Sequence, residues 1–186
     1  KVNTLEDLRT ILLSNEMPWS TTLASPILMS GNTTHDFRAN YQLNSIALIR
    51  ALAKVQLNIK LSESHQTVPI SSESIVQYKY RLFNFEKCTY ILKPISKENN
   101  LVSMSDWTNW NDQMTSIILD SKGKVTNLCL TTYLNESDNA QTSIELSLPY
   151  IDGGFLPPPE FGDETYKLQI STKIERNHWY IYDIEI

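Results

Sequence analysis

The sequence predicts a mainly β protein, and three observations carry this prediction. Charged residues make up only 20% of the 186 residues, while Ser, Thr and Asn together outnumber them. Nine Tyr and four Trp add to this pattern, and such side chains suit pleated strands better than the charged faces of helices. Short apolar stretches also recur along the chain with turn residues between them, which is typical of a β-sandwich.

Composition excludes several other classes of protein. The formal net charge of −5 argues against a general nucleic-acid binder, which needs a basic surface to neutralise phosphates. No apolar run approaches the roughly 20 residues that cross a bilayer, so we expect no membrane span in this chain. Two cysteines are too few for a cysteine-rich scaffold or a thiolate zinc site. Cys88 and Cys129 are either two half-buried thiols or one disulfide bridge.

The one clear helical segment is residues 4–13. Thr4 can cap its first turn, and Leu5, Leu8 and Leu12 recur on one face. We expect this short helix to pack on a sheet.

A loop-rich stretch follows, with one short strand over Ile27–Met29. From Ser45 to Leu61 apolar and polar residues then alternate, which predicts a long strand. A helix is the competing interpretation, since Ala, Leu and Lys favour helices, but it would place Lys54 and Asn58 on the apolar face. We expect a strand of this length to bend or to carry a bulge, and to cross from one sheet to another.

The rest of the chain predicts a series of short strands. The residues Ser121–Lys124 predict a hairpin turn that joins two antiparallel strands. The polar stretch Ser96–Asn100 is the best internal boundary, and it divides the chain into two β-sandwich modules, residues 1–98 and 99–186. The predicted strands are Ser74–Phe85, Cys88–Leu92, Thr115–Asp120, Val125–Leu134, Thr142–Leu148, Tyr166–Ile174 and His178–Ile186.

Local signatures of catalysis are absent. His35, His65 and His178 are isolated from one another and show no metal-ligand spacing, and no nucleophile-elbow, Walker or dinucleotide motif occurs. We therefore predict a protein that is not an enzyme, with no catalytic residue, cofactor or metal. Trp107 and Trp110 have polar neighbours and could form a platform for glycans, although large aromatic side chains more often supply buried area.

Five segments, taken in order, resemble a known family. Two of them are similar to its "PMSG" and "L-x-R-x-x-A-K-V" stretches, and the last two to its "YLxEN" and "RNxxY" stretches. Together they resemble the fimbrillin family of Bacteroidales, which comprises the fimbrillin-A-like and Mfa-like pilus subunits and fimbria-associated adhesins. The segments are Pro26–Gly31, Leu48–Leu57, Tyr80–Asn84 with Leu92–Pro94, Thr132–Ser137 and Glu175–Tyr180.

This resemblance implies two transthyretin-like, Greek-key sandwich modules in a cell-surface fimbrial (pilus) subunit or adhesin that polymerises with other fimbrial subunits. Assembly would use β-strand complementation, in which an extended segment of one subunit completes an open sheet of the next. The resemblance also implies export as a lipoprotein precursor, display at the outer membrane or in extracellular fimbriae, and a host or bacterial surface ligand. These 186 residues would then be a portion of a longer precursor. The alternative function is a glycan-binding surface module that uses Trp107 and Trp110.

Overall fold

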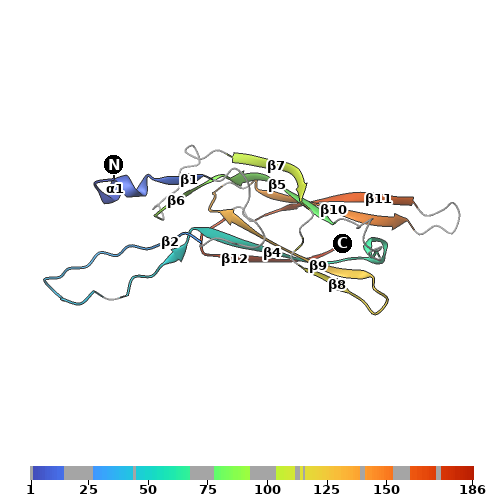
Figure 1. Cartoon of the computed structure of the whole chain (residues 1–186), viewed down its shortest axis with the longest axis horizontal. Helices are drawn as coiled ribbons and strands as arrows, with labels where there is room; N and C mark the ends of the chain where they lie inside the picture. The colour runs from blue at the N-terminus through green and yellow to red at the C-terminus, as the bar shows by residue number, and fades with distance from the viewer. Residues whose placement is uncertain are drawn as a thin grey trace.

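Two stacked β-sheets form the body of the protein in this computed structural model (Figure 1). The structure describes residues 2–14, 27–43, 45–67, 78–92, 104–111, 114, 116–138, 141–152, 160–170 and 173–186. Strands dominate the described chain, and one short helix lies near its N-terminus. The predicted mainly β, sandwich-like fold is confirmed.

The upper sheet of Figure 1 is antiparallel throughout, whereas the lower sheet contains one parallel pair, β12 with β4. The order in the upper sheet is β11 (Glu160–Gln169), β10 (Ser143–Asp152), β5 (Lys79–Glu86) and β7 (Met104–Asn111). The order in the lower sheet is β12 (Trp179–Glu185), β4 (Leu52–Lys60), β9 (Val125–Asn135) and β8 (Ser116–Leu119).

The core lies between the two sheets and follows the two-residue period of a strand. In β4 the buried residues Val55, Leu57 and Ile59 alternate with the partly exposed Lys54 and Gln56, because successive side chains point to opposite faces. Burying one such side chain stabilises the fold by about 1.5–3 kcal/mol. The other main members of the core come from β9, β5 and β10, and they are Leu128, Leu130, Leu134, Tyr80, Leu82, Phe85, Ile144, Leu146 and Leu148.

The strand predicted over 45–61 starts later than expected, because residues 45–48 lie in no strand, and the rest of the segment forms two strands. β3 (Ile49–Arg50) pairs with β2 (Met29–Ser30) in a small separate sheet, and β4 begins after a bend at Ala51. The predicted bend and change of sheet are therefore confirmed, and the competing helix is wrong.

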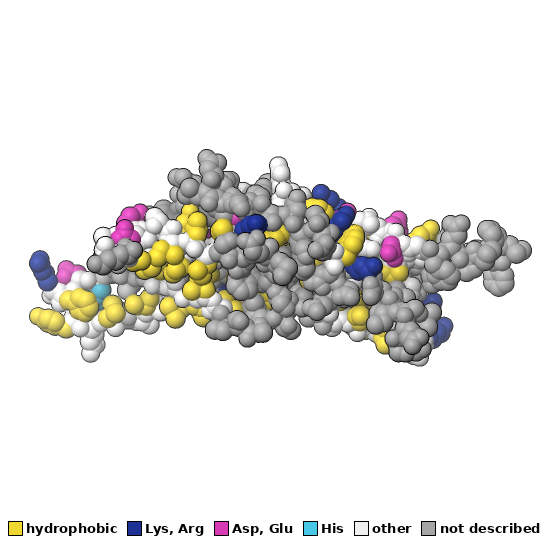
Figure 2. Space-filling model, turned by 45° about the horizontal axis from the view of Figure 1, so that its top comes forward, with side chains coloured by type: hydrophobic (Ala, Val, Ile, Leu, Met, Phe, Trp, Pro, Cys, Tyr) yellow, Lys and Arg dark blue, Asp and Glu magenta, His cyan; other side chains and the backbone are white. Residues whose placement is uncertain are grey.

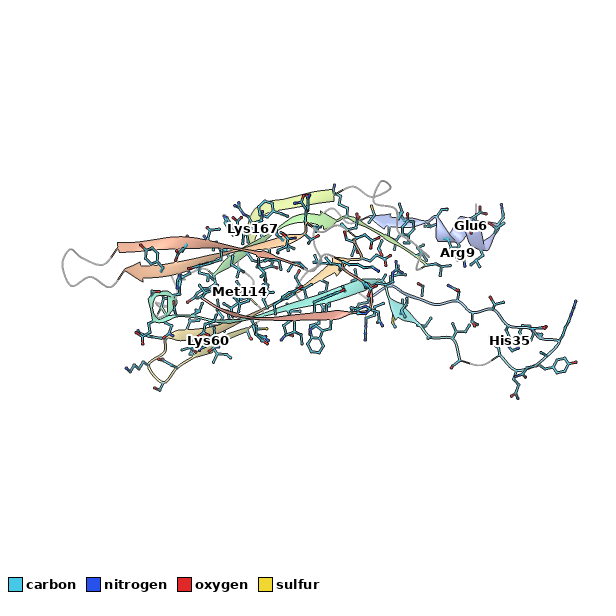
Figure 3. The ribbon with its side chains drawn as sticks, turned by 180° about the vertical axis from the view of Figure 1, so that it is seen from behind. Glu6, Arg9, His35, Lys60, Met114 and Lys167 are labelled. Carbon is cyan, nitrogen blue, oxygen red and sulfur yellow. The ribbon has the colours of Figure 1, made fainter. Side chains whose placement is uncertain are left out.

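Residues 27–43 and 45–50 form an arm that extends away from the sandwich, with His35 near its far end (Figures 1 and 3). The two legs of the arm touch at Gly31, where a Cβ atom would lie 2.1 Å from the carbonyl oxygen of Ala47. Glycine is therefore required at this contact. Figure 2 shows exposed hydrophobic side chains along the arm, which include Phe37, Tyr41, Leu43, Ile46 and Leu48.

The helix α1 (Leu5–Arg9) is shorter than predicted. It begins with a capping box, in which Thr4 accepts a bond from the backbone N–H of Asp7 and the Asp7 carboxylate accepts one from the backbone N–H of Thr4. The bond from the backbone N–H of Asn3 is the main cause that lowers the pKa of Asp7. Extending the helix through residue 13 was wrong, because β1 (Leu12–Ser14) pairs with β6 (Cys88–Tyr90) instead.

The hairpin predicted at Ser121–Lys124 joins β8 to β9 and is confirmed. The carboxylate of Asp120 accepts bonds from the backbone N–H groups of Lys122 and Lys124, both at 2.8 Å, and these bonds lower its pKa. Gly123 adopts φ of 77°, a left-handed conformation that glycine reaches without strain. Elsewhere β7 was not predicted, and β11 begins six residues before the predicted start at Tyr166.

Strands from both sides of residue 98 meet in each four-stranded sheet. β5 lies between β10 and β7, and β4 lies between β12 and β9. The division into residues 1–98 and 99–186 therefore does not coincide with a division between sheets. No helix among the described residues has the length and hydrophobicity to cross a membrane.

Candidate functional site

The outer edge of β8 is an exposed apolar edge of the lower sheet. Its four residues are all exposed and uncharged, and three of them are the large apolar residues Ile117, Ile118 and Leu119. β8 pairs with β9 on one side only, and no described strand covers the other side. An apolar strand edge of this kind is a template for pairing with another chain.

The edge of the upper sheet at β11 is built differently. Its exposed residues include Asp163, Glu164 and Lys167, and Figure 3 labels Lys167 on this strand. Charged side chains on an edge oppose the approach of a second strand, because pairing would bury them. The charges therefore protect β11, and the comparable positions of β8 lack them.

The terminal strand β12 occupies the other edge of the lower sheet. Its outward residues Asp183 and Glu185 are engaged by β4, since Asn58 Nδ2 donates to Asp183 at 2.8 Å and Lys60 Nζ lies 2.6 Å from Glu185. The Lys60 bond lowers the pKa of Glu185. The alternate residues Tyr180, Tyr182 and Ile184 pack against the core. β12 thus combines backbone pairing on one side with alternate side chains inserted between the sheets.

A buried ion pair closes the end of the sandwich where β9 ends and β12 begins. The Arg176 side chain is fully buried and meets the Glu136 carboxylate twice, from Nε at 2.9 Å and from Nη2 at 2.5 Å. Nη2 also donates to the Tyr90 carbonyl at 2.9 Å and to the Thr89 hydroxyl at 3.3 Å. Nη1 is buried and has no partner in the part of the chain that the structure describes. The pair therefore ties β6, β9 and the segment before β12 together.

Backbone contacts reinforce this end. Ser137 and Ile174 form a two-bond bridge, at 2.8 Å and 2.7 Å. Asn177 has φ of 63°, and its N–H donates to the Leu52 carbonyl at 2.8 Å. Asn tolerates this left-handed conformation better than most residues. The two C-terminal segments that carry the family resemblance thus meet here, and their polar residues hold the fold together.

The opposite end is closed by a histidine on the short 3₁₀ helix η1 (Glu63–His65). His65 is only 4% exposed, with Nδ1 2.9 Å from Ser62 Oγ and Nε2 3.1 Å from Glu164 Oε2. The Tyr166 hydroxyl donates to the same carboxylate oxygen at 2.7 Å. This bond, followed by the one from His65, lowers the pKa of Glu164, whereas burial and the adjacent carboxylate raise the pKa of Tyr166 to about 12.

Ser62, His65 and Glu164 form a hydrogen-bonded chain that resembles the triad of a hydrolase. Both ring nitrogens of His65 are, however, engaged by protein groups, and the ring is almost completely buried. A reacting atom needs open space close to both nucleophile and base, which the buried ring does not offer. The arrangement attaches η1 to β11.

The tryptophans predicted as a glycan platform both lie on β7. Position 107 pairs with Leu82, and the Trp107 side chain lies outside the described residues. Trp110 is 38% exposed, with the Arg81 guanidinium carbon 4.3 Å from its ring centroid. Arg81 is also ion-paired with Glu145. Glycan binding by this pair stays a prediction.

The remaining candidate side chains do not converge. Cys88 and Cys129 do not form a disulfide, and each is half-buried. His35 lies on the arm, His65 is the last residue of η1, and His178 lies before β12, where its Nδ1 is 3.1 Å from the Arg176 carbonyl. Within the described ranges no three His, Cys, Asp or Glu side chains form a group that could hold a metal ion.

Sequence reasoning placed a strand over β8 but did not mark it as a site. The available signal was the run Ser-Ile-Ile-Leu at residues 116–119, which contains no charge. Its importance depends on the strand being at an edge, and strand order is not visible in a local pattern. The contact between Arg176 and Glu136 was missed for the same reason, although both residues lie in segments that carry the resemblance.

Comparison with known proteins identifies the family of the chain. Residues 51–185 match the family model described as "Minor fimbrium tip subunit MfA4, C-terminal". The chain belongs to this family. It is 49% identical over 198 aligned residues to the minor fimbrium tip subunit MfA4 of Porphyromonas gingivalis, and the alignment covers 97% of the chain and 60% of that relative. The chain therefore spans about 60% of the length of this MfA4 protein, and the predicted Mfa-like fimbrillin family is confirmed.

Proposed function

We propose that the chain is part of a fimbrial tip subunit that joins other fimbrial subunits by β-strand complementation at the outer edge of β8. Family membership supports the fimbrial role, and the unprotected apolar edge of β8 supports this mode of assembly. The proposal includes export as a lipoprotein and display in fimbriae at the cell surface. The role is structural and needs no catalytic group.

Complementation at β8 would draw on two sources of free energy. An added strand would form backbone hydrogen bonds with β8, and its alternate side chains would cover Ile117, Ile118 and Leu119. β8 has only four residues and a register shift between Ile118 and Leu119, so few backbone bonds are available. Affinity at this edge therefore depends mainly on the apolar contacts, at about 25 cal/mol per Å² of apolar surface buried.

The test compares two single lysine substitutions on exposed edge positions. Ile118→Lys introduces a charge on β8, while Thr165→Lys introduces the same charge on the already charged β11. Each is made in the full-length protein, expressed in the producing bacterium without the wild-type copy. Fimbriae are then sheared from the cells and the incorporated protein is quantified by immunoblot.

We expect Ile118→Lys to lower incorporation by about tenfold or more, and Thr165→Lys to leave it close to wild type, because a charge on an apolar edge must be desolvated on pairing. Thermal melting of both purified variants controls for folding. Wild-type incorporation of a folded Ile118→Lys variant would reject β8 as the assembly edge.

A further inference from the structure

A pocket of about 300 Å³ lies where the arm joins the lower sheet. Arg50 comes from the base of the arm, and Lys54 and Tyr133 come from β4 and β9. Trp179 is the first residue of β12, and Asn177 and His178 directly precede it. Leu52 also lines it. This volume is at the lower end of the range for small-molecule sites in proteins, and it matches one sugar ring better than a long peptide.

Strand register fixes the aromatic and cationic side chains of this pocket in one row. Trp179 is the neighbour of Lys54 in the parallel pair, and Lys54 is the neighbour of Tyr133 in the antiparallel pair. The three positions share the outer face of the lower sheet, because the adjacent positions 55 and 132 are buried in the core. The row is therefore part of the sheet and does not require a loop to close.

The charges along this face are compensated at one end only. Lys60 is ion-paired with Glu185, and Asn58 engages Asp183, toward the far end of β4. In the described part of the chain, neither Lys54 nor Arg50 has a carboxylate partner.

The other contacts of the two cations leave their charge available. Lys54 Nζ lies 4.1 Å from the centroid of the Trp179 ring, and Arg50 donates to Asn177 Oδ1 at 3.4 Å. Glu175 is 3.5 Å from His178 Nε2, but it is already 2.8 Å from Lys173 Nζ. The pocket is thus a local excess of positive charge on a protein with a net charge of −5.

Trp179 supplies a flat apolar surface next to this charge. The residue is 57% exposed although it belongs to a strand of the sandwich. The face of an indole ring is electron-rich and attracts the weakly positive C–H groups of a sugar ring. The Oδ1 atom of Asn177 accepts from Arg50, and the NH2 group of the same amide can donate hydrogen bonds to hydroxyl groups.

We infer that this pocket binds an acidic saccharide, with its carboxylate on Lys54 and Arg50 and its ring against Trp179. Ammonium and guanidinium groups form the strongest hydrogen bonds to carboxylates, and a nearby aromatic face selects a ring over a free acid. The inference does not depend on strand addition at β8, because β8 is the opposite edge of the sheet. It also differs from the predicted platform at Trp107 and Trp110, which lies on the other sheet.

The test is an NMR titration of the full chain with methyl β-D-glucuronide, observing the indole N–H signals. The neutral probe is methyl β-D-glucoside, which has the same ring without the carboxylate. We expect the glucuronide to shift the Trp179 signal with a Kd on the order of 1 mM, as a single small ring would bind. The glucoside should bind at least about tenfold more weakly, because it cannot form the charge-assisted bonds.

Matched variants locate the site. Lys54→Gln should weaken glucuronide binding about tenfold or more, while Lys60→Gln, on the same strand and face, should not change it. Arg50→Gln provides a second charge removal if Lys54→Gln lowers the melting temperature.

Four results would overturn the inference. They are equal affinity for the two sugars, unchanged binding by the folded Lys54→Gln and Arg50→Gln variants, a shift of the Trp110 signal in place of Trp179, and tighter binding of a short acetylated peptide with a free C-terminal carboxylate.

Discussion

At one end of β4 the sandwich is closed by Arg176 and Glu136, and at the other end by His65 and Glu164. The two ends are roughly 26 Å apart, at about 3.3 Å per residue along this nine-residue strand. The first pair is buried and held by several hydrogen bonds from the guanidinium. In the second, the histidine is buried but half of the Glu164 side chain is exposed to solvent.

This difference predicts how the stability of each end responds to mutation and to pH. An arginine keeps its charge at every accessible pH, so the Arg176 end depends on both partners being present and little on conditions. At the His65 end the Glu164 carboxylate is half exposed and hydrogen bonds lower its pKa, so the contribution of this end is smaller and varies with pH. The family resemblance follows the same division, since both segments at the Arg176 end carry it and η1 does not.

Removing Arg176 should have the largest effect. Arg176→Met leaves the Glu136 carboxylate buried without its partner, and we expect the free energy of unfolding to fall by about 3–5 kcal/mol. Urea denaturation measures this loss. The exposed pair of Lys60 and Glu185 is the control, because solvent screens this pair and Lys60→Met should change the free energy of unfolding very little.

The double variant Arg176→Met with Glu136→Leu sharpens this prediction. Replacing both charges removes the uncompensated carboxylate, so the double variant should be more stable than Arg176→Met alone. A double variant that is as unstable as the sum of the two single losses would show that the pair does not act as a unit.

Replacing His65 should have an intermediate effect. His65→Leu keeps an apolar side chain in the buried position but removes the hydrogen bonds to Ser62 and Glu164. We expect a loss of about 1–3 kcal/mol in the free energy of unfolding. Hydrogen exchange should show faster opening at η1 and β11, with unchanged protection near Arg176. Equal loosening of both ends would contradict the division drawn between them.

Much of the sandwich could be predicted from the sequence because its strands have strict periodicity. The alternation over residues 45–61, which includes Val55, Leu57 and Ile59, identified β4 and its bend. The turn at Ser121–Lys124 identified the hairpin that follows β8. β7 was missed because Trp107 and Trp110 stand among polar residues without an alternating pattern. The β1 strand was missed because leucine spacing at its start also fits a helix, and pairing with β6 decided the outcome.

The candidate sites were harder to predict from the sequence, since they depend on contacts between distant segments. Arg176 and Glu136 are separated by 40 positions, and only the pairing around β9 and β12 brings them together. The Trp179 pocket needs the parallel register of β12 on β4, which no local pattern encodes. Edge position likewise gives β8 its importance, and strand order is a property of the whole sheet.

The smallest predicted effect is a change in acid stability at the His65 end. Bonds from Tyr166 and His65 lower the pKa of Glu164 below its ordinary value of 4.5. A lowered pKa in the folded state stabilises the protein above that ordinary value, and this contribution is lost as the pH falls through the folded-state pKa. Tyr166→Phe removes the main cause, so the variant should lose less stability than wild type between about pH 5 and pH 3.

Urea denaturation at pH 7, 5, 4 and 3 measures this slope, with Tyr180→Phe as the control at the Arg176 end. Tyr180 bonds backbone groups at residues 173 and 175, so its removal should lower stability without changing the acid slope through Glu164. Asp7, Asp120 and Glu185 also have lowered pKa values, so both variants should retain a common acid dependence. A Tyr166→Phe slope identical to wild type would show that Glu164 does not link the His65 end to pH.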